Sequence, residues 1–193
     1  MQEDEDVQLM LAFQQGDYDA FGTLVERHQP RLLRYFLAQA QDRQLAEDCT
    51  QEVWRKVFLS RDSYQPRARF LTYLLRVARN LWIDVYRARS RNPRPYLTGS
   101  GGSDEDGGGW DVHDTDGRTP LDDLMQSEQG KRIARAIIML PDSMRDVFVL
   151  SEVEDLPYQQ IGEILDIPVG TVKSRMFHAV RKLREILKKE LNG

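Results

Sequence analysis

The sequence predicts an all-α protein built from two small helical domains, a helical bundle and a helix-turn-helix unit, joined by a flexible Gly/Asp-rich linker. Three observations lead to this class. Apolar residues recur at helical spacing before residue 92 and again after residue 130. Residues 99–109 between them contain no apolar side chain that could anchor a core. A chain of 193 residues is long enough for two such units. We therefore expect domains at 1–92 and 121–193 and a linker at 93–120.

The first domain is expected to contain a series of amphipathic helices. An opening helix carries the apolar stripe Val7, Met10, Leu11 and Phe13. Gly16 ends it, and Asp17 is a candidate N-cap for the next helix. That helix carries Ala20, Phe21, Leu24, Val25 and His28. Pro30 predicts a kink or a restart, since proline removes a helical N–H donor.

A third helix is expected after Asp42, another candidate N-cap. Its inward side is formed by residues four positions apart: Leu45, Cys49, Val53 and Val57. The opposite side is polar, with Glu47, Asp48, Gln51, Glu52 and Arg55 on or beside it. Periodicity alone favours an ordinary solvated surface for this face.

A long helix is expected from Phe70 to about Arg89, after a polar loop at 61–69. Its inward residues are Phe70, Leu74, Val77, Leu81 and Val85. The other side carries a continuous strip of guanidinium and short polar groups: Arg76, Asn80, Asp84, Arg87 and Arg91. Tyr73, Trp82 and Tyr86 are candidate stacking surfaces for unpaired bases. The pattern suggests single-stranded nucleic acid, and a solvated arginine face over an aromatic core is an equal alternative.

The second domain contains a helix-turn-helix pattern. A short helix at 156–165 is buried through Ile161, Ile164 and Leu165, and a tight turn at 166–170 follows. The next helix, from Thr171 on, has the inward stripe Val172, Met176, Ala179, Leu183 and Leu187. Its outer residues are Lys173, Ser174, Arg175, Phe177, His178, Arg181 and Lys182. Such a second helix places its first turns in the DNA major groove. We expect 171–177 to meet base edges, and Arg181, Lys182 and Arg184 to meet phosphates.

Charge is distributed unevenly along the chain, although the net charge is −4. Residues 92–130 hold two Lys/Arg and nine Asp/Glu. Residues 76–94 hold six Arg and one Asp, and residues 168–189 hold seven Lys/Arg and one Glu. Basic stretches thus flank an acidic one, which is compatible with nucleic-acid binding despite the negative total.

Several function classes are disfavoured by composition. The N-terminus has no signal-peptide pattern and the longest apolar stretch is interrupted by charges, so we expect a cytoplasmic protein without membrane insertion. Cys49 is the single cysteine and lies on an inward stripe, which favours packing. His28, His113 and His178 show no metal-ligand spacing with it. We therefore expect no metal, no cofactor and no enzymatic activity.

The motifs of the two halves together resemble a known family. Gly16-Asp17, Ala20-Phe21 and Leu24 come first, then Asp48-Cys-Thr-Gln51-Glu52-Val53-Trp54, then 70–87 with Ala78-Arg79-Asn80. This half resembles region 2 of the extracytoplasmic-function (ECF, group 4) bacterial sigma factors. Leu140-Pro141, Arg145, Leu156-Pro-Tyr158, Ile161-Gly162 and 168–184 resemble region 4 of the same family. The resemblance covers nearly all of the chain outside the N-terminal tail and the linker, and follows the family's order.

The resemblance implies an alternative sigma factor that binds RNA polymerase core and directs promoter-specific initiation. Its implied partners are the β′ clamp and β subunits, promoter DNA and an anti-sigma factor. The implied clamp contacts are Asp48, Gln51, Glu52 and Arg55. The implied minus-ten contacts, which include a pocket for a flipped base, are Tyr64, Arg67, Arg69, Tyr73, Arg76, Asn80, Asp84 and Arg87. The implied minus-thirty-five contacts are Thr171, Lys173, Ser174, Arg175, Phe177, His178, Arg181 and Lys182. The acidic linker is expected near the RNA exit region, as a hypothesis for RNA mimicry.

Two other functions remain open at this point. The chain could be a free-standing operator-binding regulator that uses only the helix-turn-helix, or an interaction protein that has lost DNA binding. Polymerase binding distinguishes a sigma factor from the operator regulator. Salt-dependent duplex binding distinguishes the regulator from the interaction protein.

Overall fold

The computed structural model describes residues 4–40, 42–91 and 127–191, and these residues form helices and turns without a β-strand. The helices α1 (Glu5–Gln14), α2 (Tyr18–Ala40), α3 (Arg43–Leu59) and α4 (Phe70–Arg91) make the first group. A second group contains α6 (Glu128–Ile138), α7 (Asp142–Phe148), the π-helical turn η2 (Val149–Val153), α8 (Tyr158–Leu165) and α9 (Val169–Leu191). The all-α class is therefore confirmed. The expected linker at 93–120 lies outside the described residues.

The caps expected in the first group are present. Asp17 Oδ1 accepts hydrogen bonds from the amides of Asp19 and Ala20 at 3.1 and 3.2 Å. Asp42 Oδ1 accepts one from the Leu45 amide at 3.1 Å. These carboxylates satisfy amides that have no partner within their own helix. Both helix starts thus lie where the sequence predicts them.

Two local features differ from the sequence expectations. Helix α2 is one continuous helix from Tyr18 to Ala40 with Pro30 inside it, so the helix does not restart at this proline. Helix α9 starts at Val169, two residues before the expected Thr171. The Pro168 carbonyl accepts hydrogen bonds from the amides of Thr171 and Val172 at 2.8 and 3.1 Å, which draws Val169 and Gly170 into the first turn.

Asp4 joins the beginnings of two helices that are distant in sequence. Its Oδ1 accepts a hydrogen bond from the Asp6 amide at 3.2 Å and caps α1. Its Oδ2 accepts one from the Phe70 amide at 3.0 Å, at the first residue of α4. Because Phe70 has a fully buried side chain, this bond fixes the start of α4 against the core of the first group.

Most of the predicted inward residues lie in the core, whereas Val77 on α4 and Leu187 on α9 are half-buried and pack against it. On α3, Cys49, Val53 and Val57 are essentially fully buried, and the same holds for Phe70 and Leu74 on α4. The buried side chains of the two groups form one continuous cluster. Trp82, which the sequence suggested as a stacking surface, is also part of this cluster and is 7% exposed.

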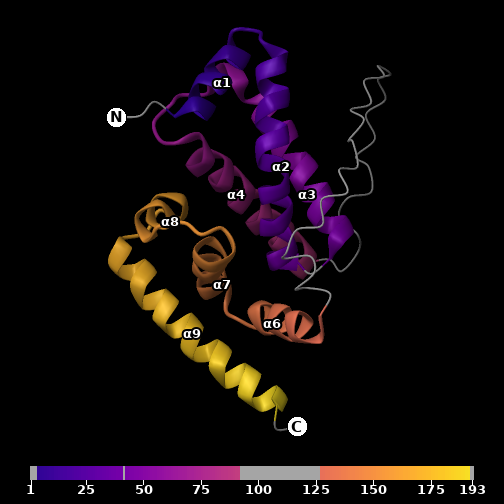
Figure 1. Ribbon diagram of the computed structural model, residues 1–193, viewed down its shortest axis with the longest axis vertical. Helices are drawn as coiled ribbons and strands as arrows, with labels where there is room; N and C mark the ends of the chain where they lie inside the picture. Colours follow the sequence, from indigo (N-terminus) through magenta and orange to yellow (C-terminus); the bar gives the residue numbers. More distant parts are fainter. Residues whose placement is uncertain (1–3, 41, 92–126, 192–193) are drawn as a thin grey trace.

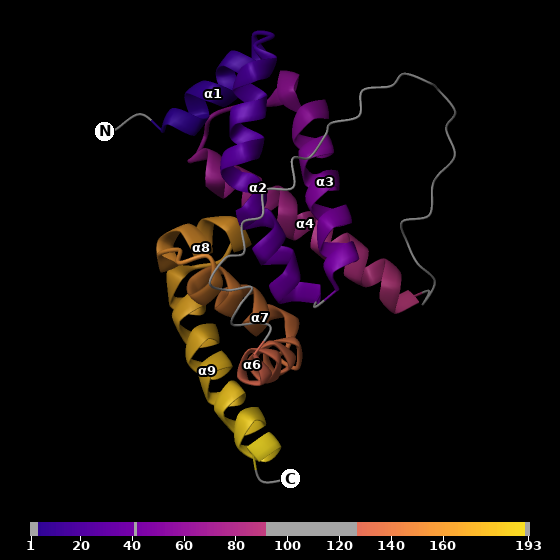
Figure 2. The same cartoon turned by 45° about the vertical axis from the view of Figure 1, so that its right-hand side comes forward.

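The two groups lie against each other. Figures 1 and 2 show the first group above and the second below. Helices α7 and α8 lie between the first group and α9. Helix α8 contacts α4, while α6 and η2 contact α2. The long helix α9 packs on α6, α7 and α8, and leaves its other side open.

Candidate nucleic-acid interface

The outer side of α3 presents the predicted clamp contacts to solvent. Gln51 and Arg55 are exposed, and Asp48 and Glu52 are half-buried. Arg55 donates from Nε and Nη2 to both oxygens of Glu52, at 2.7 and 2.8 Å. This bidentate bond lowers the pKa of Glu52, so its carboxylate is charged at neutral pH. Gln44 donates to Asp48 Oδ1 at 3.0 Å. The result is an ordered, charged surface along α3.

The predicted strip on α4 is exposed along its described length. Arg76, Asn80, Asp84 and Arg87 are all exposed, because they lie opposite the buried side of this helix. Tyr86 beside them is 41% exposed. One member of the strip is already engaged, since Arg76 Nη2 donates to the main-chain carbonyl of Glu163 on α8 at 2.6 Å. The second group therefore touches this strip.

The loop before α4 is held by the core on one side. Gln14 Nε2 donates to the carbonyls of Arg61 at 2.9 Å and Tyr64 at 3.3 Å. Tyr64 is 6% exposed, and its ring lies edge-on to Tyr73 at a centroid separation of 5.0 Å. Tyr73 is half-buried, and its hydroxyl lies 2.8 Å from Ser60 Oγ. Of the expected aromatic contacts, Tyr64 thus presents no ring face to solvent in this conformation.

Two of the loop's arginines, Arg67 and Arg69, lie just before α4. Both Arg67 and Arg69 are exposed. Arg67 donates from Nε and Nη2 to Gln65 Oε1 at 3.0 and 2.7 Å, which holds its guanidinium against the loop. Both charges lie close in sequence to the first turn of α4. A basic loop therefore extends the strip on α4.

Helix α9 separates its buried and exposed residues as the sequence predicts. Val172, Met176 and Ala179 are buried, while Lys173, Ser174, Phe177, His178, Arg181 and Lys182 are exposed. Thr171 and Arg175 are half-buried. Phe177 is 65% exposed, so its ring is accessible on the outer side of this helix.

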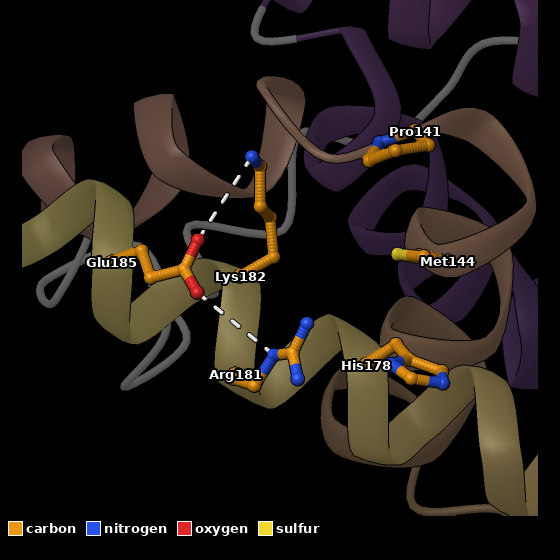
Figure 3. Close-up of a pocket in the computed structure, with 6 residues that line it drawn as sticks. All are labelled: Pro141, Met144, His178, Arg181, Lys182 and Glu185. Atoms are coloured by element: carbon orange, nitrogen blue, oxygen red, sulfur yellow. Dashed lines mark ion pairs between the residues drawn. The ribbon is translucent and has the colours of Figure 1, made fainter.

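A shallow hollow of about 230 Å³ lies beside this helix (Figure 3). It is lined by Pro141, Met144, His178, Arg181, Lys182 and Glu185. Glu185 lies 3.8 Å from Arg181 Nε and 4.0 Å from Lys182 Nζ, so one carboxylate restrains both cations. Such exposed pairs contribute little to stability, and both cations remain accessible to phosphates.

Sequence reasoning missed the polar contacts between the two groups. Arg31 of α2 binds Glu154, and Gln39 Nε2 donates to Asp146 Oδ1 at 3.2 Å. Arg79 of α4 donates to Asp146 Oδ2 at 3.5 Å. The Arg31 and Glu154 positions are 123 residues apart, so no local pattern announces the pair.

Cys49 and His28, the cysteine and a histidine weighed above as possible metal ligands, are both buried. Cys49 is buried, and burial raises the pKa of its thiol to about 12. His28 is buried, and its Nε2 lies 2.9 Å from Asp6 Oδ2. Within the described ranges, no cluster of three or more His, Cys, Asp or Glu side chains is arranged to hold a metal ion. The described helices also include none that is long and apolar enough to span a membrane.

Comparison with known proteins connects this geometry to a family. Residues 24–92 match the model of Sigma-70 region 2, and residues 130–183 match the model of Sigma-70, region 4. The first match contains α3 and α4, and the second contains the helix-turn-helix of α8 and α9.

Individual relatives agree with these matches. The ECF RNA polymerase sigma factor SigW of Bacillus subtilis is 35% identical over 176 residues, which is 91% of each chain. The fold is similar to CnrH in its complex with the cytosolic domain of CnrY, with a TM-score of 0.70, 21% identity and coverage of 96% and 99%. It is also similar to RpoE of Bartonella quintana in complex with the anti-sigma factor NepR, with a TM-score of 0.62, 20% identity and coverage of 87% and 96%. With both regions matched in order and this identity over most of its length, the chain belongs to the ECF family of RNA polymerase sigma factors.

Proposed function

We propose that this protein is an alternative sigma factor that binds RNA polymerase core in the cytoplasm and directs initiation at selected promoters. The observation that carries this proposal is the combination, on one chain, of an exposed charged face on α3, a basic strip on α4 and the open side of α9. A free-standing operator regulator needs only the last of these. The chain would supply recognition, and the catalysis of RNA synthesis would belong to the polymerase.

The α4 strip and the loop before it would bind the minus-ten element as a melted strand. Guanidinium groups of Arg67, Arg69, Arg76 and Arg87 are suited to phosphates and base edges, because their donors form a rigid fork. The exposed ring of Tyr86 offers a stacking surface for an unpaired base. In this proposal Tyr64 and Tyr73 pack beneath the loop and support its conformation. An unpaired base could reach their rings only if the loop moved.

Helix α9 would bind the minus-thirty-five element as a duplex. Its first turns carry Lys173, Ser174 and Arg175, which match the position from which a recognition helix reads base edges. Arg175→Ala should weaken minus-thirty-five recognition by about 1–3 kcal/mol, the usual value of one base contact, without loss of core binding. Lys188→Ala, near the C-terminal end of the same helix, is the control and should change specificity little. Loss of core binding in Arg175→Ala would contradict the assignment.

The α3 face would dock on the β′ clamp of the polymerase. Replacing Asp48 and Glu52 by lysine reverses its charge, and should release core polymerase without unfolding the chain. Glu26→Lys makes the same kind of change at an exposed position of α2 and should leave the affinity for core unchanged. Undiminished core binding by the Asp48/Glu52 variant would rule out this face as the docking surface.

An anti-sigma factor is the expected regulator, in keeping with the family and with the NepR complex of the similar Bartonella quintana protein. The decisive experiment combines the purified chain with bacterial core polymerase in gel filtration and in run-off transcription on a genomic promoter library. A complex that starts at selected promoters supports the sigma-factor proposal. Specific duplex binding without a polymerase complex would favour the operator regulator instead.

A further inference from the structure

Helix α1 binds both ends of the loop that precedes α4. At the start of the loop, Gln14 Nε2 donates to the main-chain carbonyls of Arg61 at 2.9 Å and Tyr64 at 3.3 Å. At its end, Asp4 Oδ2 accepts a hydrogen bond from the Phe70 amide at 3.0 Å. Figures 1 and 2 both show α1 beside the segment that leads into α4. One helix thus fixes the two points between which the loop runs.

A side-chain amide is the group that suits the start of the loop. The carbonyl of Asp62 also accepts from Gln14 Nε2, at 3.3 Å, so three carbonyls converge on one nitrogen. They belong to the 3₁₀ turn η1 (Arg61–Ser63) and to the residue after it. Converging carbonyl oxygens repel one another, and an NH₂ group with two N–H donors offsets this repulsion. A side chain of similar length without a donor would not hold them together.

The Arg61 side chain gives the start of the loop a second attachment. Its guanidinium carbon lies 5.7, 5.8 and 5.7 Å from the ring centroids of Phe13, Tyr18 and Phe58. At this range a guanidinium is attracted by the π electrons of each ring. Arg61 Nη1 also donates to the Tyr18 hydroxyl at 3.0 Å. Because the three rings come from α1, α2 and α3, the start of the loop is tied to all three helices.

Helix α1 is itself fixed by contacts that do not involve the loop. The side chains of Met10 and Phe13 are fully buried. Asp6 forms an ion pair with Arg27 of α2, and its Oδ2 lies 2.9 Å from Nε2 of His28 on the same helix. A helix of ten residues measures roughly 15 Å, so the two attachment points of the loop are held at a set separation.

The loop held in this way carries exposed groups that were assigned above to the minus-ten element. Arg67 and Arg69 are exposed, whereas the Tyr64 ring is buried edge-on against Tyr73. Both arginines lie between the two attachment points, so a shift at either point would move their guanidinium groups relative to α4. A guanidinium distinguishes bases only when its fork of donors is aligned with the base edge. Displacement on the order of 1 Å is enough to lose such alignment.

From these contacts we propose that Gln14 and Asp4 are positioning residues: through α1 they set the conformation of the loop at 61–69, and thereby the base preference at the minus-ten element, without touching DNA. The effect on base preference rests on the DNA-binding role proposed above, whereas the fixing of the loop does not. Substitutions on α1 should therefore change which promoters are used, although no residue of this helix was assigned to the promoter.

Two nearly isosteric substitutions, one at each end of α1, test this proposal in the full chain. Gln14→Met keeps the length of the side chain and removes its donors. Asp4→Asn keeps the shape and leaves one carbonyl oxygen to accept from two amides, those of Asp6 and Phe70. Gln8→Met is the matched control, because Gln8 is exposed on the same helix. Circular dichroism and thermal unfolding check that each variant is folded.

Hydrogen exchange followed by mass spectrometry measures the loop directly. The amides of Ser63 and Tyr64 donate to carbonyls of the same turn at 3.1 Å, and they stay protected only while η1 keeps its shape. Peptides that cover 60–70 should exchange about tenfold faster in Gln14→Met and Asp4→Asn than in the wild type or the control. Unchanged exchange in both variants would overturn the fixing of the loop by α1.

Run-off transcription by the reconstituted holoenzyme then measures base preference. The templates are one promoter that the wild-type chain selects from the genomic library, and versions with single base changes in the minus-ten or the minus-thirty-five element. Both variants should lose about tenfold of the preference for the original minus-ten bases, the value of one well-placed base contact. The minus-thirty-five preference and the affinity for core polymerase should stay as in the wild type.

The ratio between templates separates positioning from a general loss of stability. A merely structural role would lower transcription from every template by the same factor, and that result would overturn the proposal. Faster exchange with unchanged minus-ten preference would overturn the effect on base preference, while the fixing of the loop would stand. Failure of the sigma-factor proposal would be seen separately, as absence of a complex between the wild-type chain and core polymerase, and hydrogen exchange would still decide whether α1 fixes the loop.

Discussion

Replacement of Gly162 by alanine tests how the helix-turn-helix is held together. Gly162 lies on α8, and a Cβ atom there would be 2.9 Å from the carbonyl oxygen of Ile167, a main-chain atom in the turn before α9. That turn cannot easily retreat, because the Ile167 amide donates to the Gly162 carbonyl at 3.0 Å. Asp166 between them is left-handed, with φ of 54°. The close approach of α8 and the turn therefore requires glycine.

The magnitude follows from two opposing effects. Overpacking costs about 1–3 kcal/mol, and a Cβ pressed against a main-chain atom that cannot easily retreat belongs in the upper part of that range, roughly 2–3 kcal/mol. Alanine regains roughly 1 kcal/mol of helix propensity over glycine. We expect Gly162→Ala to lower the free energy of unfolding by about 1–2 kcal/mol. Because α9 would shift relative to α8, duplex binding should weaken as well.

Urea denaturation followed by circular dichroism measures the change, and Gly170→Ala is the matched control. Gly170 lies on α9, and a Cβ atom there would meet nothing within 4 Å. The control should be neutral or stabilising by up to about 1 kcal/mol. Equal stability of Gly162→Ala and the wild type, or equal losses in the two variants, would refute the close-approach argument.

Other predictions concern single side chains. Burial lowers the pKa of His28 below 6.5, so the unfolded chain binds the proton first and stability should fall as pH drops below about 7. Thermal unfolding at pH 7.5 and 5.5 should show this loss in the wild type and less of it in His28→Gln; an unchanged pH dependence would contradict it. Because the pKa of Cys49 is about 12, an aromatic disulfide reagent at pH 8 should label it only after unfolding; rapid labelling of the folded chain would disprove its burial. Asp17→Ala removes the α2 cap and should cost about 1 kcal/mol in urea denaturation, whereas no loss would show that the cap is dispensable.

The sequence predicted the helices because their signals are local. Asp17 and Asp42 cap helices where the pattern of apolar residues begins, and the inward stripe of α3 is buried as its spacing requires. The exposed strip on α4 and the open side of α9 follow from the same periodicity. Family resemblance then added roles that periodicity cannot assign, and the residue-level contacts to polymerase and DNA stay predictions.

What the sequence did not predict depends on distant partners. Tyr64 and Trp82 are as aromatic as Tyr86, yet the first two are buried and the third is exposed. Their surroundings are set by packing between helices, and an aromatic residue on a helix is compatible with either outcome. The pairing of Arg31 with Glu154 was likewise invisible, because each looks like an ordinary surface charge until the groups meet.

The π-helical turn η2 has a consequence for comparisons among relatives. A π turn accommodates one more residue than an α turn, and residues in an α-helix are spaced by roughly 100° about its axis. A relative that is one residue shorter within 149–153 would carry the carboxylate equivalent to Glu154 about a quarter-turn away from Arg31. Segment length, together with an arginine and a glutamate at these positions, therefore indicates which members of the family can form the same contact between α2 and the residue after η2. Conservation of the two charges without the extra residue would not suffice.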